Sequence, residues 1–372
     1  MLSVLVHINT LRYAVPTAIM MGCAPQYFSL VVGWRSVSCL LPERWYRAVD
    51  DKIWSTYQRL IEFFFEHYTG VEVILYGDVD HLEKGENVIY MSNHQSTLDW
   101  VVADMMAVRA GCLGYMRYVL KDGLKYMPLY GYYFGVHGSV FVKRNKQFDE
   151  RNQRQFMDKL TRFKKNNIPV WMVVFPEGTR FDPNREGMIK HSQGYAYQQN
   201  LTVLHQVLTP RIRAFHMCLV GLQDHVNAVY DVTIAYSNTG EKSDEDTIQR
   251  TSAPSLPEFL TGICPQVHIH LRRIQLDCIP LDVTECQRWI HERFEEKERM
   301  LVDFYSNDPD KQGRLEGEGC RSKLPLYSTV PALLFSLGFA APWLLTSTGR
   351  SLYWKVWALG AVGGALWMKI VT

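Results

Sequence analysis

Apolar and polar residues alternate along the middle of the chain in a way that predicts strands separated by helices. Short apolar runs rich in strand-forming residues lie at 71–75, 88–91, 140–142, 170–175, 231–236 and 267–271. Stretches with helical periodicity or many charges, at 97–109 and 149–166, predict helices between these strands. Because strands alternate with helices, we predict an α/β domain at residues 70–305.

Polar and amphipathic stretches flank or interrupt this domain. Residues 237–257 are polar and rich in turn formers, which predicts a loop, and residues 306–323 predict a polar linker. Residues 43–69 combine helical periodicity with many aromatic side chains. Such a helix either covers the domain or lies in a membrane interface.

Uncharged runs at both ends of the chain predict membrane segments. No residue between Arg12 and Arg35 is charged, and none is charged from Leu324 to Gly349. Uncharged runs beyond about 18 residues are long enough to cross a bilayer. We predict an N-terminal membrane anchor at 1–42 and a C-terminal transmembrane hairpin at 324–372, with buried core helices as the alternative.

Composition narrows the class of protein. Of 372 residues, 47% are hydrophobic and 21% are charged, which excludes a disordered chain. The net charge of +2 does not indicate a nucleic-acid partner. The eight cysteines form no C-x-x-C pair, so neither a metal site nor a disulfide framework is expected.

His94 and Asp99 are the first candidates for chemistry, because they follow directly after the predicted strand at 88–91. A neutral imidazole can deprotonate an alcohol when a carboxylate holds its other ring nitrogen. On one continuous helix the five-residue offset would place the two side chains about 140° apart. They can meet if His94 lies in a loop and Asp99 in the first helical turn, with Ser96 or Thr97 as the cap. A purely structural histidine is the alternative.

Two further motifs offer groups for an anion. Phe-Pro-Glu-Gly-Thr-Arg at 175–180 follows an apolar strand, and ligands of α/β sheets bind beyond the carboxyl ends of strands. Arg180 has a planar guanidinium suited to a phosphate. Residues 138–144 form a short strand that ends in Lys143 and Arg144, for which a solvated surface pair is the alternative.

Together these motifs resemble, in order and spacing, the glycerolipid acyltransferase family, which includes the 1-acyl-sn-glycerol-3-phosphate acyltransferases. The first family block corresponds to Asn93, His94 and Asp99, and the third stands intact at 175–180. The second corresponds to Gly138, Phe141 and Arg144. We place the fourth, a looser match, at 207–211.

The resemblance implies a glycerolipid-acyltransferase-type α/β sheet with flanking helices. It implies that His94 is the general base and that Asp99 orients it. The acceptor phosphate would be bound by residues of the second and third blocks: Gly138, Phe141, Lys143, Arg144, Glu177, Gly178, Thr179 and Arg180. Of these, Glu177 is expected to anchor Arg180 or a backbone amide. Neither a metal nor a cofactor is implied, since acyl-CoA is a co-substrate.

The expected reaction is acylation of lysophosphatidic acid at its sn-2 hydroxyl, which gives phosphatidic acid. Another lysophospholipid, such as lysocardiolipin, is the alternative acceptor. A lipid serine hydrolase would need a G-x-S-x-G elbow, which the chain lacks, and Ser96 is better explained as a helix cap than as a nucleophile. A non-catalytic scaffold would have no use for His94 and Asp99. We expect an endoplasmic reticulum membrane, with a mitochondrial membrane as the alternative, and a domain that faces the cytosol.

Overall fold

The structure is a computed structural model that describes residues 2–143, 150–242 and 248–371. The chain forms two compact units, each assembled from separate stretches of sequence. Unit 1 comprises Met1–Phe64, Ala107–Val173 and Pro325–Thr372, and unit 2 comprises Phe65–Met106 and Val174–Leu324. The domain boundaries expected from the sequence at 43, 70, 306 and 324 stay predictions.

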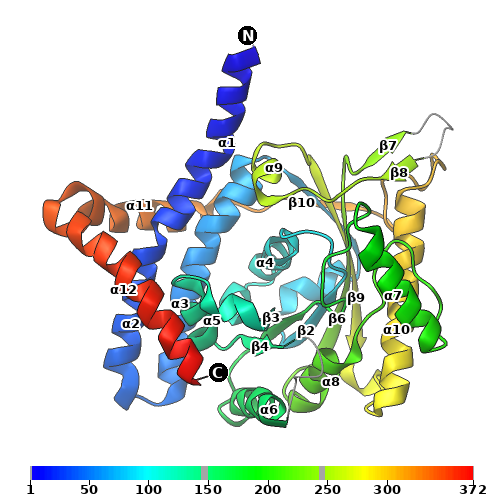
Figure 1. The fold of residues 1–372 in the computed structure, drawn as a ribbon, viewed down its shortest axis with the longest axis horizontal. Helices are drawn as coiled ribbons and strands as arrows, with labels where there is room; N and C mark the ends of the chain where they lie inside the picture. The colour runs from blue at the N-terminus through cyan, green and yellow to red at the C-terminus, as the bar shows by residue number, and fades with distance from the viewer. Residues whose placement is uncertain (1, 144–149, 243–247, 372) are drawn as a thin grey trace. The chain divides into compact units, whose positions relative to one another are not determined.

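Unit 1 is mainly helical, as Figure 1 shows, and its described residues include three short strands. Its helices are α1 (Leu2–Gly22), α2 (Ala24–Val37), α3 (Glu43–Glu62), α5 (Tyr130–His137), α6 (Glu150–Lys165), α11 (Val330–Leu345) and α12 (Ser347–Val371). Its strands are β3 (Met116–Lys121), β4 (Val140–Val142) and β5 (Trp171–Val174). Strand β3 pairs in parallel with both β4 and β5.

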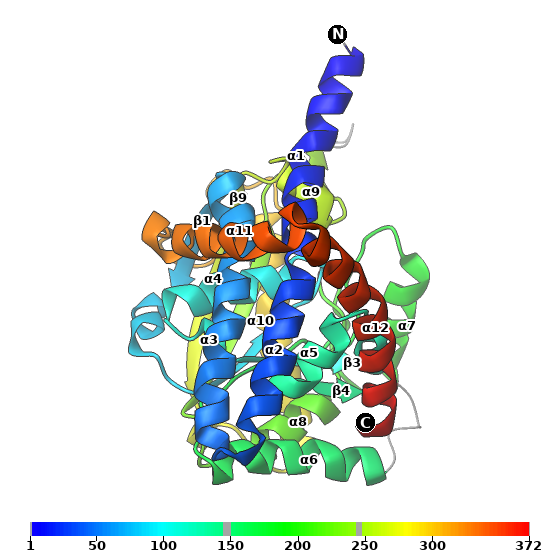
Figure 2. The same cartoon turned by 90° about the vertical axis from the view of Figure 1, so that its left-hand side faces the viewer.

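The terminal helices pack against the rest of unit 1. Figure 2 shows α2 and α3 side by side, with α11 lying across them and α12 running past α5. The hydroxyl groups of Tyr27 on α2 and Ser336 on α11 are 2.9 Å apart. Arg59 on α3 donates to the carbonyl oxygen of Ser328 at 2.7 Å. Helix α3 covers most of the stretch at 43–69 that was expected to form an amphipathic helix, and α2 and α11 pack against it. Its interfacial location stays a prediction.

One continuous stretch, Asn9–Leu40, is long and apolar enough to cross a membrane. At the other end, α11 and α12 pass the same test only as a pair, and they are bent by 105° at their junction. The legs of a transmembrane hairpin run nearly antiparallel, so this geometry does not confirm the C-terminal hairpin. Thr346, which lies between the helices, is extended and forms the corner.

Unit 2 contains a mixed sheet in the order β10-β1-β9-β6-β2. Its strands are β1 (Glu72–Gly77), β2 (Val88–Ser92), β6 (Ala228–Tyr236), β9 (Gln266–Gln275) and β10 (Cys320–Ser322). The pairs β1–β9 and β2–β6 are parallel, whereas β6–β9 and β1–β10 are antiparallel. Every residue of β2 and β6 is buried, which explains their unbroken apolar runs.

Helices and a separate hairpin complete unit 2. The helices are α4 (Asp99–Arg109), α7 (Glu186–Gln198), α8 (Ile212–Gly221), α9 (Leu256–Leu260) and α10 (Val283–Phe304). Strands β7 (Gly240–Lys242) and β8 (Ile248–Arg250) pair antiparallel. The α/β prediction is confirmed, but the loop predicted at 237–257 is wrong in part, because it contains this hairpin and the start of α9.

Candidate active site

His94 and Asp99 meet at the carboxyl end of β2. The strand ends at Ser92, a short loop follows, and α4 begins at Asp99. The Nδ1 atom of His94 lies 2.7 Å from Oδ2 of Asp99, which is a hydrogen-bonding distance. The Asp99 side chain is 0% exposed, whereas 22% of the His94 side chain is exposed. The second ring nitrogen of His94, Nε2, is therefore the one that can face a ligand.

The Asp99 carboxylate is fixed by three further hydrogen bonds. The backbone amides of Gln95 and Ser96 donate to Oδ2 at 2.6 and 2.9 Å. The hydroxyl of Tyr236, the last residue of β6, donates to Oδ1 at 2.7 Å. Burial, with the nearby Asp99 charge, raises the pKa of Tyr236 well above its ordinary value, so the hydroxyl remains a donor. The carboxylate is therefore held in one orientation toward His94.

Ser96 serves the local backbone. Its hydroxyl donates to the carbonyl oxygen of Pro254 at 2.5 Å and accepts from the amide of Leu98 at 3.1 Å. The residue is 3% exposed. These contacts match the helix-cap interpretation and leave the hydroxyl poorly placed for a nucleophile.

Glu177 joins two segments of the site through its buried carboxylate. Oε1 accepts from the backbone amide of His94 at 2.7 Å, and Oε2 accepts from that of Leu208 at 2.9 Å. Of the two anchors expected from the sequence, the structure shows the backbone amide. Burial raises the pKa of Glu177 to about 8, while the two amides and the charge of Arg250 oppose that rise.

The turn at 175–180 lies against the His94 loop. The rings of Phe175 and His94 stack, with centroids 4.5 Å apart and planes 25° from parallel. The amide of Phe181 donates to the carbonyl oxygen of His94 at 2.7 Å. Gly178 has a φ of +68°, a left-handed conformation that favours glycine in this tight turn. Arg180 is exposed at the end of the turn and is accessible to an anion.

The fourth block packs on the same turn. The amide of Arg211 donates to the carbonyl oxygen of Pro176 at 2.8 Å. The Arg211 guanidinium lies 3.3 Å from the centroid of the Tyr195 ring, so it is held by a cation–π contact. Thr179 is half-buried beside Gly178. The looser sequence match at 207–211 therefore coincides with a physical contact to the third block.

Family models match both halves of unit 2 and the stretch between them. A family model described as Acyltransferase matches residues 73–236, and one described as Acyltransferase C-terminus matches residues 258–331. The chain is 42% identical over 371 residues to 1-acyl-sn-glycerol-3-phosphate acyltransferase epsilon of Mus musculus, covering 100% of this chain and 99% of that protein. The chain belongs to the 1-acyl-sn-glycerol-3-phosphate acyltransferase family.

Other proteins similar to this acyltransferase include a plant and a fish enzyme and one solved structure. It is 33% identical over 285 residues to probable 1-acyl-sn-glycerol-3-phosphate acyltransferase 5 of Arabidopsis thaliana, covering 75% of this chain and 70% of that one. It is 29% identical over 273 residues to lysocardiolipin acyltransferase 1 of Danio rerio, covering 73% of this chain and 65% of that one. The crystal structure of the LPA acyltransferase PlsC from Thermotoga maritima matches with a TM-score of 0.41 and 18% identity, covering 78% of this chain and 98% of that one.

The second block of the acyltransferase belongs to unit 1, whereas the other site residues belong to unit 2. Gly138 follows α5 with a φ of +116°, and an added Cβ would lie 2.7 Å from the Phe163 ring, so only glycine fits. Phe141 is half-buried in β4, and Lys143 is exposed just after it. Arg144 lies outside the described residues.

Three residues of the site were not predicted from the sequence: Gln95, Tyr236 and Arg250. Tyr236 stands at the carboxyl end of a predicted strand, so its position could have marked it as a candidate. Gln95 is adjacent to His94 but has no distinctive spacing. Arg250 lies in the segment that was predicted to be a loop, where no local pattern points to the site.

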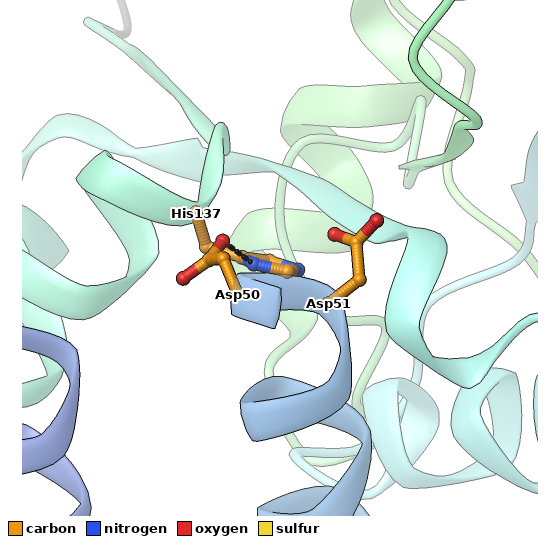
Figure 3. Close-up of side chains that lie close together, drawn as sticks. All are labelled: Asp50, Asp51 and His137. Atoms are coloured by element: carbon orange, nitrogen blue, oxygen red, sulfur yellow. Dashed lines mark hydrogen bonds and ion pairs between the residues drawn. The ribbon is translucent and has the colours of Figure 1, made fainter. Parts of the chain in front are cut away.

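A cluster in unit 1 has side chains of the types that bind metals. Asp50, Asp51 and His137 are buried, and each offers a ligand atom within 4.8 Å of the others. Figure 3 shows the His137 ring between the two carboxylates, with Nδ1 bonded to Asp50 at 2.7 Å. Arg117 donates to Asp51 at 2.5 Å, and Arg47 lies 3.8 Å from Asp50. Because two arginines already balance the two carboxylates, a divalent cation would add uncompensated buried charge. We therefore assign the cluster a structural role.

Proposed function

We propose that this acyltransferase moves a fatty acyl group from acyl-CoA to the sn-2 hydroxyl of 1-acyl-sn-glycerol 3-phosphate, which forms phosphatidic acid and CoA. The main support is the hydrogen bond of 2.7 Å between His94 and the buried Asp99, in a chain that matches this family along its full length. Acyl-CoA enters the proposal as a co-substrate, and no further cofactor is proposed.

In the proposed mechanism His94 acts as a general base. Its Nε2 atom takes the proton of the acceptor hydroxyl while that oxygen attacks the thioester carbonyl. Asp99 holds the Nδ1–H group and stabilises the imidazolium that forms. The tetrahedral intermediate then collapses, the carbon–sulfur bond breaks, and the imidazolium gives its proton to the CoA thiolate. An acyl-enzyme is unnecessary, because the thioester is already activated.

We assign binding of the acceptor phosphate to the second and third blocks. The charged members are Lys143, Arg144 and Arg180. Gly178 and Thr179 contribute backbone and hydroxyl donors from the turn, and Gly138 and Phe141 shape the second block. Glu177 acts indirectly in this proposal, since both of its oxygens accept from backbone amides. A guanidinium such as that of Arg180 can bind a phosphate through two parallel hydrogen bonds.

An acceptor panel tests the substrate. Membranes containing the protein are given labelled oleoyl-CoA with lysophosphatidate, lysophosphatidylcholine, lysophosphatidylinositol or monolysocardiolipin, and the labelled lipid products are separated. We expect labelled phosphatidic acid as the main product. Membranes that lack the protein provide the background. Faster transfer to a different lysophospholipid would overturn the assigned acceptor while leaving the reaction class intact.

Lysocardiolipin is the second candidate acceptor. The similarity to lysocardiolipin acyltransferase 1 of Danio rerio, at 29% identity, favours keeping it in the panel. A cationic group such as Arg180 binds both a phosphate monoester and a diester, so the charge of the site does not separate the two acceptors. A serine hydrolase, in contrast, would release labelled fatty acid from a labelled phospholipid without CoA, which a parallel incubation that lacks acyl-CoA detects.

We further propose that the protein is an integral protein of the endoplasmic reticulum membrane, with a mitochondrial membrane as the alternative and the catalytic domain facing the cytosol. The apolar N-terminal stretch Asn9–Leu40, with no charged residue between Arg12 and Arg35, supports an anchor. The C-terminal hairpin remains part of this proposal. Fractionation against markers of both organelles tests the location. Protease protection of tags placed at the two termini tests the topology.

A further inference from the structure

Arg250 ends the small hairpin β7–β8, and its side chain is buried although the hairpin is peripheral to the sheet of unit 2. The residue is 8% exposed. Its guanidinium lies between two aromatic rings, 4.4 Å from the centroid of Phe181 and 4.8 Å from that of Tyr305. Contacts on both faces fix the plane of the guanidinium and direct its N–H groups sideways.

Those N–H groups reach two separate segments of the chain. One terminal nitrogen, Nη2, donates to the side-chain oxygen of Gln95. The other, Nη1, donates to the backbone oxygen of Gln206 at 2.6 Å and to its side-chain oxygen at 2.9 Å. Within the described part of the chain these acceptors are all neutral. The charge of Arg250 acts instead on Glu177, where it opposes the rise in pKa that burial causes.

Of the four described residues that Arg250 contacts, three, Gln95, Phe181 and Gln206, are next to a part of the candidate site in the sequence. Gln95 follows His94, and the backbone amide of Gln95 donates to Oδ2 of Asp99 at 2.6 Å. Phe181 follows Arg180, and its amide donates to the carbonyl oxygen of His94 at 2.7 Å. Gln206 precedes the fourth block, in which the amide of Leu208 donates to Glu177.

We infer that Arg250 is a positioning residue whose guanidinium holds the His94 loop, the 175–180 turn and the fourth block in one arrangement. It touches neither His94 nor Asp99 in this role and acts through Gln95, Phe181 and Gln206. The inference rests on the proposed function, because it assumes that the placement of His94 limits the rate. Misplacement of a catalytic group by about 1 Å can lower a rate by about a hundredfold.

The geometry also explains why lysine would be a poor substitute. A lysine ammonium is a compact charge without a planar fork, so it cannot donate to Gln95 and Gln206 from two fixed directions while lying flat between two rings. Arg250→Lys therefore keeps the positive charge near Glu177 but loses the paired hydrogen bonds to Gln95 and Gln206 and the stacking between the rings. Arg250→Ala loses both.

Arg273 provides a matched control. It lies in the same unit, on β9, and its guanidinium bonds Glu86 through two nitrogens at 2.7 and 2.8 Å. Arg273→Ala removes an arginine that donates through two nitrogens, as Arg250→Ala does, but the removed contacts do not reach the His94 loop. A general loss of folded stability would affect both variants.

The test compares kcat, KM for both substrates and melting temperature of the full-length wild type, R250A, R250K, R273A and H94A. We expect R250A to lower kcat by about a hundredfold with KM changed by less than about threefold, and R250K to lower kcat by about tenfold. We expect R273A to keep kcat within about twofold of the wild type. Millimolar guanidinium should restore part of the R250A rate and none of the H94A rate.

Several outcomes would overturn the inference. One is a kcat of R250A and R250K within about twofold of the wild type, and another is an equal loss in R250A and R273A at matched melting temperature. If R250A does not fold, the kcat of R250K decides, because it keeps the buried charge. If H94A retains wild-type transfer, the proposed function fails and the inference falls with it. If H94A is inactive while both Arg250 variants are fully active, only the role of Arg250 is wrong.

Discussion

At the scale of residues, the site depends on two buried carboxylates whose oxygens are all engaged. Asp99 accepts from an imidazole, a phenol and two amides, whereas Glu177 accepts from two amides on different segments. A carboxylate that accepts several hydrogen bonds is fixed in orientation and costs less to keep charged. Asp99 therefore acts on the His94 ring, and Glu177 acts on the His94 backbone.

Asp99→Asn tests the first of these roles. Four donors face the Asp99 oxygens, so the NH2 group of an asparagine at this position would oppose a donor and favour the wrong tautomer of His94. We expect kcat to fall by about a thousandfold or more, with a small change in melting temperature. Tyr236→Phe removes one donor and leaves the carboxylate, so its kcat should fall by about tenfold. Equal kcat values for D99N and the wild type would contradict the role of Asp99.

Glu177→Gln tests the pH dependence of stability. The pKa of Glu177 in the folded chain is about 8, above its ordinary value of 4.5, so the folded state binds this proton more tightly than the unfolded state does. The contribution of Glu177 to the free energy of unfolding should therefore fall as the pH rises from about 4.5 to 8. Thermal unfolding at several pH values should show this decline in the wild type relative to E177Q. The exposed Glu318→Gln is the control, and a difference between wild type and E177Q that stays constant with pH would contradict the assignment.

At the scale of elements, local pattern accounts for strands β1, β2, β4, β5, β6 and β9 and for the His94–Asp99 pair. An apolar run that stops at Asn93 and a helix that starts at Asp99 are both visible in the sequence. Strand β3 was missed because it contains Arg117, a charge that is buried only because Asp51 pairs with it. The contact of Gln95 with Arg250 joins positions 155 apart, and no periodicity encodes such a pairing.

The packing of α3 on α5 gives a second pH prediction. His137 is fully buried, and its ring stacks on Trp54 with centroids 4.0 Å apart. Burial and the nearby Arg117 lower the pKa of His137 to about 4, below its ordinary 6.5, although Asp50 opposes the shift. The unfolded chain then binds this proton more tightly, so the stability contributed by His137 is present above pH 6.5 and is lost toward pH 4.

His137→Asn should remove that acid sensitivity. Burial raises the pKa of Asp51 to about 6, so Asp51 changes the pH dependence of stability in the opposite direction. Because Asp51 is present in both the wild type and H137N, its effect cancels in the comparison. We expect the wild type to lose about 3 kcal/mol relative to H137N as the pH falls from 6.5 to 4. Chemical unfolding across that pH range measures this loss, with the half-buried His216→Asn as the control. Parallel pH profiles for wild type and H137N would contradict a neutral, buried His137.

At the scale of the whole molecule, unit 2 contains the His94 site and unit 1 contains both termini. The terminal helices of unit 1 present large apolar side chains to the outside. The most exposed on α11 and α12 include Leu334, Leu345, Trp354, Leu359, Val362 and Ile370. An apolar surface of this extent is unusual for a protein that stays in water and fits a bilayer.

Membrane extraction tests this arrangement. We expect the full-length protein to stay in the membrane pellet after alkaline carbonate and after high salt, and to be released by detergent. Apolar burial in a bilayer resists both aqueous treatments, whereas attachment by charge alone is reversed by salt. Release by salt would show that the terminal helices do not enter the hydrocarbon region.

The most direct test of the account is the single-turnover rate of acyl transfer from oleoyl-CoA to lysophosphatidate by His94→Ala, compared with the wild type and with His216→Ala. A general base and its imidazolium contribute about a hundredfold to ten-thousandfold to such a step. We expect H94A to lose at least a hundredfold in this rate and H216A to match the wild type. A rate for H94A within about twofold of the wild type would contradict the claim that His94 removes the proton of the acceptor.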